Sequence, residues 1–375
     1  MKSHVALRRL YNQHLGSPPL ATAQDVVRAL GAVQSQDYGS AKWAVARRTE
    51  SLTDPDVERA VDSGAILRTH VLRPTWHFVL REDARWMLGL TAPRIRMSMS
   101  YHDRELGLDR VVVRRSHAVL ERALRDGQQL TRAELAELFR RARVAVPTGQ
   151  HVGHLLMRAE LDRVIISGAR RGKQATYALF DDRVPPAPER ERDESLQDLA
   201  RRYFATRGPA TLQDFAWWSG LTVADAKRAV EINGRALNRE SIAGRDHWSA
   251  RGSRDGAPVT RGAHLLPNYD ELFVGFRDRL AFAERLRIQN PKARVDALLG
   301  HMLFIDGQIV GGWRRTLGRT IDVEVRVPSA LSATEQKLVE REIRRFGDFL
   351  GAPARVRYRR GAVALTAASS RDSTM

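Results

Sequence analysis

Two glutamines separated by one residue, Gln34 and Gln36, are the first candidates for chemistry in this chain. A glutamine amide does not ionise near neutral pH, so it can orient a reactant or stabilise charge but cannot act as a general acid or base. Asp37 follows directly and is an ionisable alternative base. At i and i+2, both amides can converge on one point in a turn or at a helix end. The spacing alone is more often that of two polar residues at a helix end, so it does not establish catalysis.

A strand-like stretch, Ile66–Leu80, carries His70, Trp76 and His77. Such residues are commonly interior, so a buried aromatic strand with satisfied imidazoles is one interpretation. The alternative is that these side chains line a site beside the glutamines. His151 and His154 have a helical spacing, but there are no cysteines and no carboxylates nearby to complete a site. We therefore predict no metal and no cofactor.

Two basic segments are candidates for contact with a phosphate backbone. Their residues are Arg170, Arg171 and Lys173 in the first segment, and Arg314, Arg315 and Arg319 in the second. Clustered Lys and Arg are typical of nucleic-acid-binding surfaces, although they also occur on ordinary solvated turns. The charged stretch Pro267–Arg279 is interpreted as structural, because Asp270, Glu271, Arg277, Asp278 and Arg279 can satisfy one another as a charge network.

The composition favours a protein that binds a polyanion. The 375 residues carry 62 Lys and Arg against 44 Asp and Glu, a net charge of +18. Unpaired charge is costly to bury, so we expect the surplus at the surface, where it attracts nucleic acid first and anionic membrane second. No apolar run approaches the roughly 20 residues of a membrane span. The N-terminus lacks a secretory signal, and the absence of Cys excludes disulfides and cysteine nucleophiles. We expect a cytoplasmic location.

A helix start signal occurs three times along the chain. Thr22, Thr131 and Thr211 are each followed three positions later by Asp or Glu, so the hydroxyl can cap a helix while the carboxylate returns toward the Thr amide. Each is preceded by an amphipathic helix. These helices are expected at Val5–His14, Val113–Arg125 and Ser195–Thr206. The recurrence predicts a repeated unit.

The second of these units is the clearest. A capped helix to about Arg141 and a helix over His151–Asp162 are followed by two strand-like runs, Val164–Gly168 and Ala175–Phe180, with a basic tip between them. Three helices followed by a hairpin form the winged-helix arrangement, whose β-wing can reach a phosphate backbone. The sequence therefore predicts an α+β, mainly helical fold of tandem winged helix-turn-helix units.

The rest of the chain divides around these units. Further elements are predicted as helices at Asp54–Asp62, Thr222–Ile232 and Ser332–Leu350, strands at Leu237–Ile242, His247–Ala250, Gly311–Leu317, Thr320–Val327 and Ala354–Arg359, and a hairpin over Met302–Val310. In that hairpin Asp306-Gly307 suits a type I′ turn. Predicted boundaries are 1–110 for the first winged-helix unit, 111–185 for the second, 190–255 for the third and 256–375 for a β-rich, barrel-like α+β region.

Three stretches of the sequence resemble the AlkZ-like bacterial DNA glycosylases. They are Ala32–Asp37, Leu67–His77 and Leu265–Arg279. The resemblance spans most of the chain, from about Ala6 to about Tyr358. It implies tandem winged-helix motifs around a concave basic DNA-binding face, and excision of N7-alkylated purines. It also implies that some members unhook interstrand crosslinks or confer self-resistance in antibiotic producers.

The catalytic motif of that family, two glutamines separated by one residue, falls on Gln34 and Gln36. A sister branch has Asp at the second position, so Gln36 places this chain with the two-glutamine branch. Ser35 departs from the apolar residue that is common between them. The substrate removes the need for an acid, because an N7-alkylated purine is cationic and leaves as a neutral base. Amide dipoles can then position water and stabilise an oxocarbenium-like sugar.

The resulting hypothesis is a monofunctional bacterial DNA glycosylase acting on N7-alkylguanine in duplex DNA, without metal, membrane or obligate protein partner, and monomeric. No Lys lies in the motif to form a Schiff base. Bulky adducts are accommodated if the base needs less complete extrusion than in pocket-type glycosylases. The alternatives are a non-catalytic winged-helix regulator of undamaged DNA, and a module that binds RNA or acidic partners.

Overall fold

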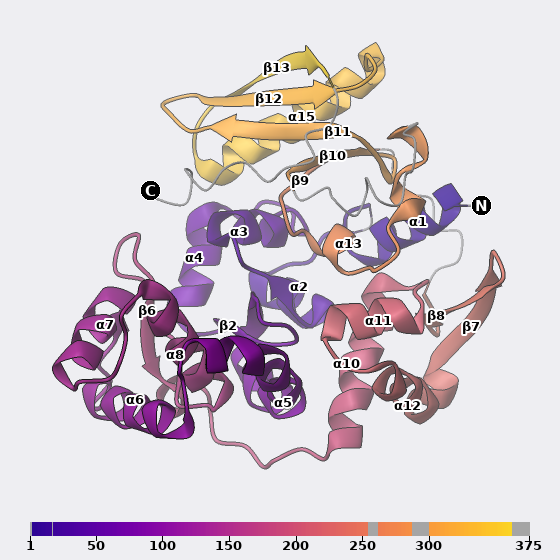
Figure 1. Cartoon of the computed structure of the whole chain (residues 1–375). Coiled ribbons are helices and arrows are strands. Elements are labelled where there is room, and N and C mark those ends of the chain that lie inside the picture. Colours follow the sequence, from indigo (N-terminus) through magenta and orange to yellow (C-terminus); the bar gives the residue numbers. More distant parts are fainter. Residues whose placement is uncertain (1, 17, 254–261, 287–299, 362–375) are drawn as a thin grey trace.

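The computed structural model describes residues 2–16, 18–253, 262–286 and 300–361. The fold is mixed α+β, and close to half of it is helical. Within these residues no helix is both long and apolar enough to cross a membrane. The sheet of the C-terminal part lies at the top of Figure 1, with helical units below it on either side of the N-terminal elements.

One order of elements, helix, strand, helix, helix and hairpin, occurs three times. In the first repeat the elements are α2 (Ala23–Leu30), β1 (Val33–Gln34), α3 (Tyr38–Ala46), α4 (Asp54–Asp62), β2 (Ile66–His70) and β3 (Trp76–Leu80). In the second they are α6 (Arg110–Ala123), β4 (Leu130–Thr131), α7 (Arg132–Arg141), α8 (Gly149–Leu161), β5 (Ile165–Ser167) and β6 (Thr176–Leu179). Both form a three-stranded antiparallel sheet in which the last strand is central, β1-β3-β2 and β4-β6-β5.

The third repeat has the same order with a shorter first strand. Its elements are α10 (Arg192–Arg207), α11 (Leu212–Ser219), α12 (Val223–Asn233), the 3-10 turn η1 (Gly234–Ala236), β7 (Leu237–Ile242) and β8 (Arg245–Ala250). A single antiparallel bridge between Ala210 and Trp248 replaces the first strand. The expected helices and hairpins of the second and third units are therefore present, with ends shifted by a few residues.

The expected alignment of the first unit is wrong by one helix. Thr131 and Thr211 cap the second helix of their repeats, α7 and α11, each with a complete capping box. Thr22 instead caps α2, the first helix of its repeat, and Asp25 accepts a hydrogen bond from its hydroxyl. The equivalent of Thr131 is Asp37, which caps α3 by accepting from the Ser40 amide at 3.0 Å. A cap signal marks the start of any helix, so it could not distinguish first from second.

Before the C-terminal part, three described α-helices lie outside the repeats. They are α1 (Lys2–Asn12), α5 (Arg81–Glu105) and α9 (Phe180–Arg183). The 25-residue helix α5 was not predicted from the sequence and contains Pro93. It joins the first repeat to the second, and its buried residues pack in the same core cluster as α10 and α11. Between α9 and α10, residues 184–191 have no regular secondary structure.

The C-terminal part is a sheet covered by one long helix. Its regular elements are β9 (Ala263–Leu266), α13 (Glu271–Val274), η2 (Leu280–Phe282), η3 (Glu284–Leu286), β10 (Met302–Ile305), β11 (Gln308–Thr316), β12 (Ile321–Val327), α15 (Ala333–Leu350) and β13 (Ala354–Arg360). The described strands run in the order β13-β12-β11-β10-β9, with β9 and β13 at the edges. The sheet is therefore open, and the expectation of a barrel-like region is not met. Strand β13 pairs in parallel with β12, which requires the crossover made by α15.

The predicted turn at Asp306-Gly307 is confirmed. Both residues have positive φ, 50° and 75°, as a type I′ turn requires. The separate strand expected over Gly311–Leu317 is instead the continuation of β11, so one strand spans both segments. The helix expected over Ser332–Leu350 is present as α15; Ser332 caps it with a capping box, and Gly351 ends it in the left-handed conformation.

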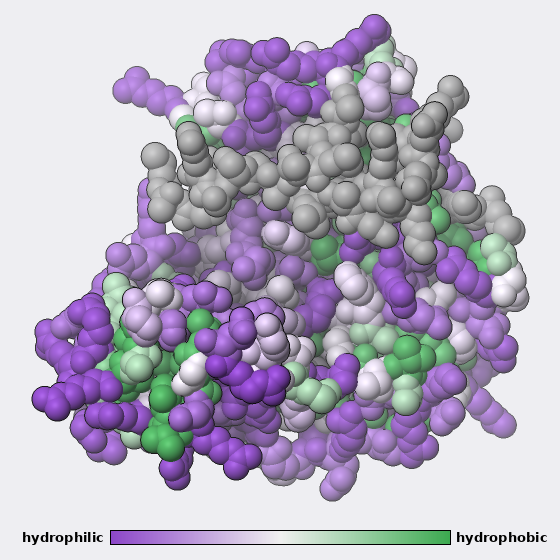
Figure 2. Space-filling model, in the orientation of Figure 1, coloured by the Kyte–Doolittle hydropathy of each residue, from purple (hydrophilic) through white to green (hydrophobic). Residues whose placement is uncertain are grey.

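The first repeat shares a core with the C-terminal sheet. One cluster of buried side chains includes Val33 and Phe78 of the repeat together with Val325 and Phe346 of the C-terminal part. The Trp43 indole N–H donates to the Leu265 carbonyl at 2.7 Å across this junction. The second repeat has a separate cluster between α6, α7 and α8. Figure 2 shows a mainly hydrophilic surface, with apolar residues gathered over the second repeat and near α11.

A fully buried ion pair also fastens the first repeat to the C-terminal part. The two terminal nitrogens of the Arg48 guanidinium, Nη1 and Nη2, each donate to Asp270 at 2.9 Å, and neither side chain is exposed. Removing one partner of such a pair leaves an uncompensated buried charge, which costs about 3–5 kcal/mol. Asp270→Asn should therefore lower the free energy of unfolding by about that amount in urea denaturation.

The matched control is Asp246→Asn. Asp246 pairs with Arg239 at 2.6 Å, but the two side chains are 40% and 67% exposed. Solvent screens such a pair, so this variant should lose about 1 kcal/mol or less. Equal losses in the two variants would show that the Arg48–Asp270 pair does not hold the parts together.

Candidate active site

The strand that carries the glutamine motif is held by a buried carboxylate. The Gln34 backbone N–H donates to Glu271 Oε1 at 2.8 Å. The other oxygen, Oε2, accepts from Arg207 at 2.6 Å and from the Trp218 indole N–H at 2.9 Å. Glu271 and Arg207 are fully buried. One carboxylate thus joins the first repeat, the third repeat and the C-terminal part at the motif.

The Gln34 side chain is oriented by an arginine. Its Oε1 accepts from Arg73 at 2.8 Å, and the residue is only 8% exposed. Burial lowers the pKa of Arg73, and the nearby charge of Glu271 opposes this. An Arg guanidinium stays protonated in proteins, so Arg73 remains a charged donor. An amide oxygen has two lone pairs, so the Gln34 carbonyl keeps one for a reactant.

Arg73 lies in a tight connection between β2 and β3. Leu72, which precedes it, has a positive φ of 65°. The C-cap residue Gly220 of α11 packs directly against this connection: a Cβ added there would lie 2.0 Å from the Leu72 carbonyl oxygen. The third repeat therefore supports the loop from which Arg73 reaches Gln34.

Gln36 lies in a different environment from Gln34. Its side chain is exposed, and its Oε1 accepts from the Trp76 backbone N–H at 3.4 Å. The Ser35 amide donates to the Trp76 carbonyl at 2.7 Å, and the Arg68 guanidinium donates to the Ser35 carbonyl at 2.8 Å. The motif loop is thus fastened to β3 and β2, with Gln34 buried and Gln36 exposed.

The motif occupies a position where the first repeat is longer than the others. In the second repeat the cap residue Thr131 belongs to the strand itself, and in the third Thr211 follows directly on the bridged residue Ala210. In the first repeat Ser35 and Gln36 lie between the strand end and the cap residue Asp37. These two residues join the strand end to the cap, and Gln36 carries the second amide.

The ionisable residues next to the motif have other roles. Asp37 is half-buried and caps α3. His77 lies opposite Gln34 in the sheet, is fully buried, and its Nδ1 bonds the Thr75 carbonyl at 2.9 Å. Burial, and then the charge of Arg73, lower the pKa of His77 well below its usual value. His77 is therefore neutral near pH 7 and is a poor proton donor.

His70 belongs to a second buried carboxylate cluster. Its ring Nδ1 lies 2.6 Å from Glu160 Oε2, which also accepts from the His70 backbone N–H at 2.9 Å. The His70 ring lies 4.7 Å from that of Trp76, centroid to centroid. The alternative of a buried, hydrogen-bonded imidazole therefore describes His70 well, with Trp76 between it and the motif. The sequence did not indicate Glu160, which lies 90 residues away.

Arg315, one of the predicted basic residues, lies close to the helix that follows the motif. Its Nη2 lies 4.0 Å from the position that a Cβ would take at Gly39, two residues after the cap residue Asp37. Its guanidinium also lies 3.5 Å from His301 Nε2. Burial, and then the charge of Arg315, lower the pKa of His301 to about 4, against the opposing charge of Asp37. His301 was not predicted from the sequence.

Arg170 also lies near the motif, and the remaining predicted basic residues pair with acids or are exposed. Arg170 pairs with Glu58 at 3.2 Å and lies over the Tyr38 ring at 4.3 Å, so it packs on the first repeat. Arg171 pairs with Glu134 at 2.7 Å. Arg314 pairs with Glu324 at 2.8 Å. Lys173 and Arg319 are exposed.

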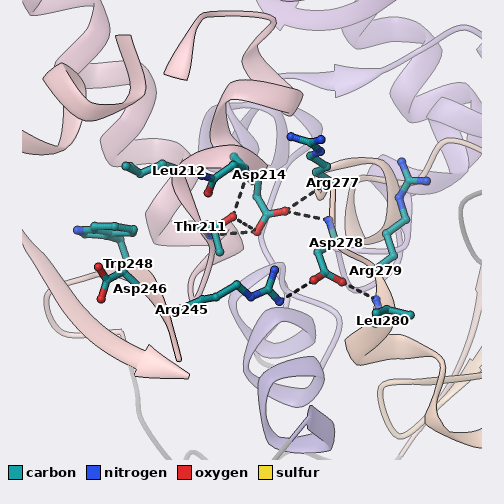
Figure 3. Close-up of a pocket in the computed structure, with 11 residues that line it drawn as sticks. Thr211, Leu212, Asp214, Arg245, Asp246, Trp248, Arg277, Asp278, Arg279 and Leu280 are labelled. Atoms are coloured by element: carbon teal, nitrogen blue, oxygen red, sulfur yellow. Dashed lines mark hydrogen bonds and ion pairs between the residues drawn. The ribbon is translucent and has the colours of Figure 1, made fainter. Parts of the chain in front are cut away.

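The charged stretch near Arg279 is structural, but its predicted pairing is wrong. Its acids do not satisfy the arginines of the same stretch: Asp278 pairs with Arg245 of β8 at 2.6 Å, and Asp270 and Glu271 pair with Arg48 and Arg207. Arg279 donates to the backbone carbonyls of Phe273 and Phe276. Figure 3 shows Asp214 bonded to the backbone of Arg277 and Asp278 around a cavity of about 420 Å³. Neither Gln34 nor Gln36 lines that cavity.

No group of three or more metal-ligating side chains gathers in the described part of the chain. His154 instead bonds Asp103 at 3.0 Å, and His151 bonds the Thr148 hydroxyl at 2.8 Å.

Three comparisons relate the chain to known proteins. A family model described as DNA glycosylase AlkZ-like matches residues 27–349. The interstrand DNA cross-link repair glycosylase of Streptomyces sahachiroi is 25% identical over 330 residues, covering 81% of this chain and 85% of that protein. The solved structure of Streptomyces sahachiroi DNA glycosylase AlkZ has a TM-score of 0.77 at 22% identity, covering 95% of this chain and 99% of that one. The structural likeness shows a shared fold.

The environment of Ser35 predicts a gain in stability on substitution. Its side chain is fully buried, and its hydroxyl has no hydrogen-bond partner among the described residues. An unsatisfied buried hydroxyl is unfavourable, so Ser35→Ala should raise the free energy of unfolding by about 1 kcal/mol in urea denaturation.

Ser219 is the matched control for this measurement. It is equally buried, but its hydroxyl donates to the Phe215 carbonyl at 2.7 Å and accepts from the Leu221 amide at 3.3 Å. Ser219→Ala should therefore lose about 1 kcal/mol. A loss of stability in Ser35→Ala would contradict the prediction.

Proposed function

The chain belongs to the AlkZ-like DNA glycosylase family, and on that premise we propose that it hydrolyses the N-glycosidic bond of N7-alkylated guanine in duplex DNA, with Gln34 and Gln36 as its catalytic residues. The observation that carries the proposal is the surroundings of the two amides. Gln34 ends strand β1 and Gln36 lies in the loop that follows, while the neighbouring Asp37 caps a helix and burial keeps His77 neutral. Such a site suits a leaving group that needs no acid.

The chemistry follows from the charge of the substrate. Alkylation at N7 gives the purine a positive charge, so cleavage of the C1′–N9 bond returns the electron pair to N9 and releases a neutral base. The sugar becomes oxocarbenium-like, water adds at C1′, and its proton passes to solvent. The carbonyl dipoles of Gln34 and Gln36 stabilise the developing positive charge and orient the water, because their positions are set before the reaction.

Arg73 is a positioning residue in this scheme. By occupying one lone pair of the Gln34 carbonyl at 2.8 Å, it fixes the direction of the amide dipole. The buried anion Glu271 lies beside Gln34 and offsets the charge of Arg73.

We further propose that the three repeats are winged-helix units that bind DNA, with boundaries near 1–110, 111–185 and 190–255. Their shared order of helix, strand, helix, helix and hairpin supports this, since it is the order of a helix-turn-helix followed by a wing. The β11–β12 hairpin contributes Arg314, Arg315 and Arg319 to DNA contact. The second wing contributes Arg170, Arg171 and Lys173.

The name of the Streptomyces relative supports a wider substrate range. That protein is called an interstrand DNA cross-link repair glycosylase. We propose that this chain likewise accepts bulky N7 adducts or crosslinks formed by DNA-alkylating natural products, and acts in repair or self-resistance.

The first test replaces both catalytic amides. Gln34→Ala/Gln36→Ala should lower the rate of base release from an N7-methylguanine duplex by at least about 100-fold, because preorganised dipoles at the reacting centre are lost. Abasic sites measure release, and fluorescence anisotropy measures duplex binding, which should change little. The exposed Gln128, changed to Ala, is the control.

Wild-type release rates in the double variant would refute the assignment of the glutamines. If the wild-type protein instead bound a preferred undamaged sequence and released no base, the chain would be a DNA-binding regulator.

The second test concerns the β11–β12 hairpin. If Arg319 contacts a phosphate, Arg319→Ala should weaken binding to damaged and undamaged duplexes alike, and reduce the slope of log K against log salt by about 1. Arg285→Ala serves as the control and should leave the slope unchanged, because Arg285 lies outside the three repeats and the hairpin, is 41% exposed and pairs with Glu335 at 2.7 Å. An unchanged slope in Arg319→Ala would remove this residue from the interface.

A further inference from the structure

A cavity of about 500 Å³ lies between the first and second repeats. Its walls come from β2 and β3 of the first repeat, and from α7, α8, β5 and β6 of the second. Ala133 and Ala136 line one side from successive turns of α7, and Tyr177 lines another from β6. Neither the glutamines nor the proposed DNA contacts account for this space.

The cavity shares a wall with the catalytic loop. Arg68 and Trp76 line it, with the guanidinium carbon 4.1 Å from the Trp76 ring centroid. The same Arg68 donates to the Ser35 carbonyl, and the Trp76 backbone N–H donates to the Gln36 side chain. A group attached to a base held at Gln36 therefore needs to extend only past Trp76 to reach the cavity.

The lining suits a flat, uncharged group. Trp76 and Tyr177 offer aromatic surface, Ala133, Ala136 and Val152 offer aliphatic surface, and the Arg68 guanidinium is a planar cation that stacks well on aromatic rings. The one acid in the wall, Glu160, is already occupied by Thr69 and by the backbone and ring of His70. It offers little to a cationic ligand, and Arg132, the second arginine of the wall, donates to the Gly149 carbonyl.

We propose that this cavity is a subsite for a planar aromatic substituent carried on the N7 position of the damaged guanine. The inference rests on the proposed function and specifies its substrate class. The volume supports it, since pockets of about 300–1,000 Å³ hold drug-sized ligands. A methyl group would leave the cavity empty. The enzyme should therefore gain affinity and orientation from a polycyclic adduct that a simple alkyl lesion cannot provide.

An extruded nucleobase is the other planar aromatic group that could enter. The two sources are separated by comparing duplexes that carry N7-methylguanine and N7-(anthracenylmethyl)guanine. Both contain the same base, so a filled cavity should affect them equally if it receives the base, and unequally if it receives the substituent.

Ala133→Trp fills the cavity from an exposed helical position, so the variant should fold. It should slow release of the anthracenylmethyl adduct by about tenfold or more while changing release of N7-methylguanine less than about twofold. Ala136→Leu, a smaller filling from the next turn, should give an intermediate effect. Ala118→Trp is the matched control, because Ala118 is exposed on α6 and does not line the cavity.

Each other outcome has one meaning. Equal slowing of both substrates by Ala133→Trp would assign the cavity to an extruded base, and no slowing of either would leave it without a role; both results overturn the proposal. Wild-type protein that releases N7-methylguanine but not the anthracenylmethyl adduct would overturn it and leave the proposed function standing. Wild-type protein that releases neither base would refute the proposed function and this inference with it.

Discussion

The carboxylate of Glu271 is the interaction on which the arrangement of the site depends. It is buried without access to solvent, and its three hydrogen bonds go to the backbone of Gln34, to Arg207 and to Trp218. A buried charge is tolerated only when it is paired and its remaining lone pairs are satisfied. Each of the three segments must therefore take its place for the others to be stable. The position of the motif strand is thus tied to the assembly of the whole chain.

The three repeats share one arrangement of helices and strands, but only the first carries the two glutamines. All three use a polar residue to cap the helix after the first strand: Asp37, Thr131 and Thr211. Only in the first do two residues, Ser35 and Gln36, lie between the strand end and this cap. Because the cap and the sheet keep their positions, the chain accommodates two additional residues between them without a change of fold. The same reasoning gives Asp37 a structural role beside the glutamines.

The arginine content of this chain has two uses that composition cannot separate. Arg48 and Arg207 are fully buried and paired with acids. Arg73 donates to the Gln34 side chain, and Arg68 donates to the Ser35 carbonyl. Arg170 and Arg171 of the second wing pair with glutamates. A net charge of +18 remains, so a basic surface is still expected. The prediction concerned only this surplus; composition does not say which arginines are buried, and buried arginines are stable where carboxylates neutralise them.

The sequence by itself determined the local elements. Capping boxes and tight turns depend on residues within three positions of one another, so they can be predicted from sequence. The examples here are the capping boxes at Thr131, Thr211 and Ser332 and the turn at Asp306-Gly307. The glutamine motif was also found from the sequence, but through family resemblance, since two amides have no spacing that compels catalysis. The assignment of Thr22 to the second helix of the first repeat was wrong, because a cap does not show which helix of a repeat it begins.

Only the tertiary structure decided what surrounds the motif. The partners of Glu271 lie 237, 64 and 53 residues away, and Glu160 lies 90 residues from His70. The cavity beside Trp76 is made by two repeats, neither of which encloses it alone. Such contacts arise when burial forces distant polar groups to find one another, and no local pattern records the outcome. The open C-terminal sheet is a further case, because neither edge strand, β9 or β13, shows in its own sequence whether it pairs with the other.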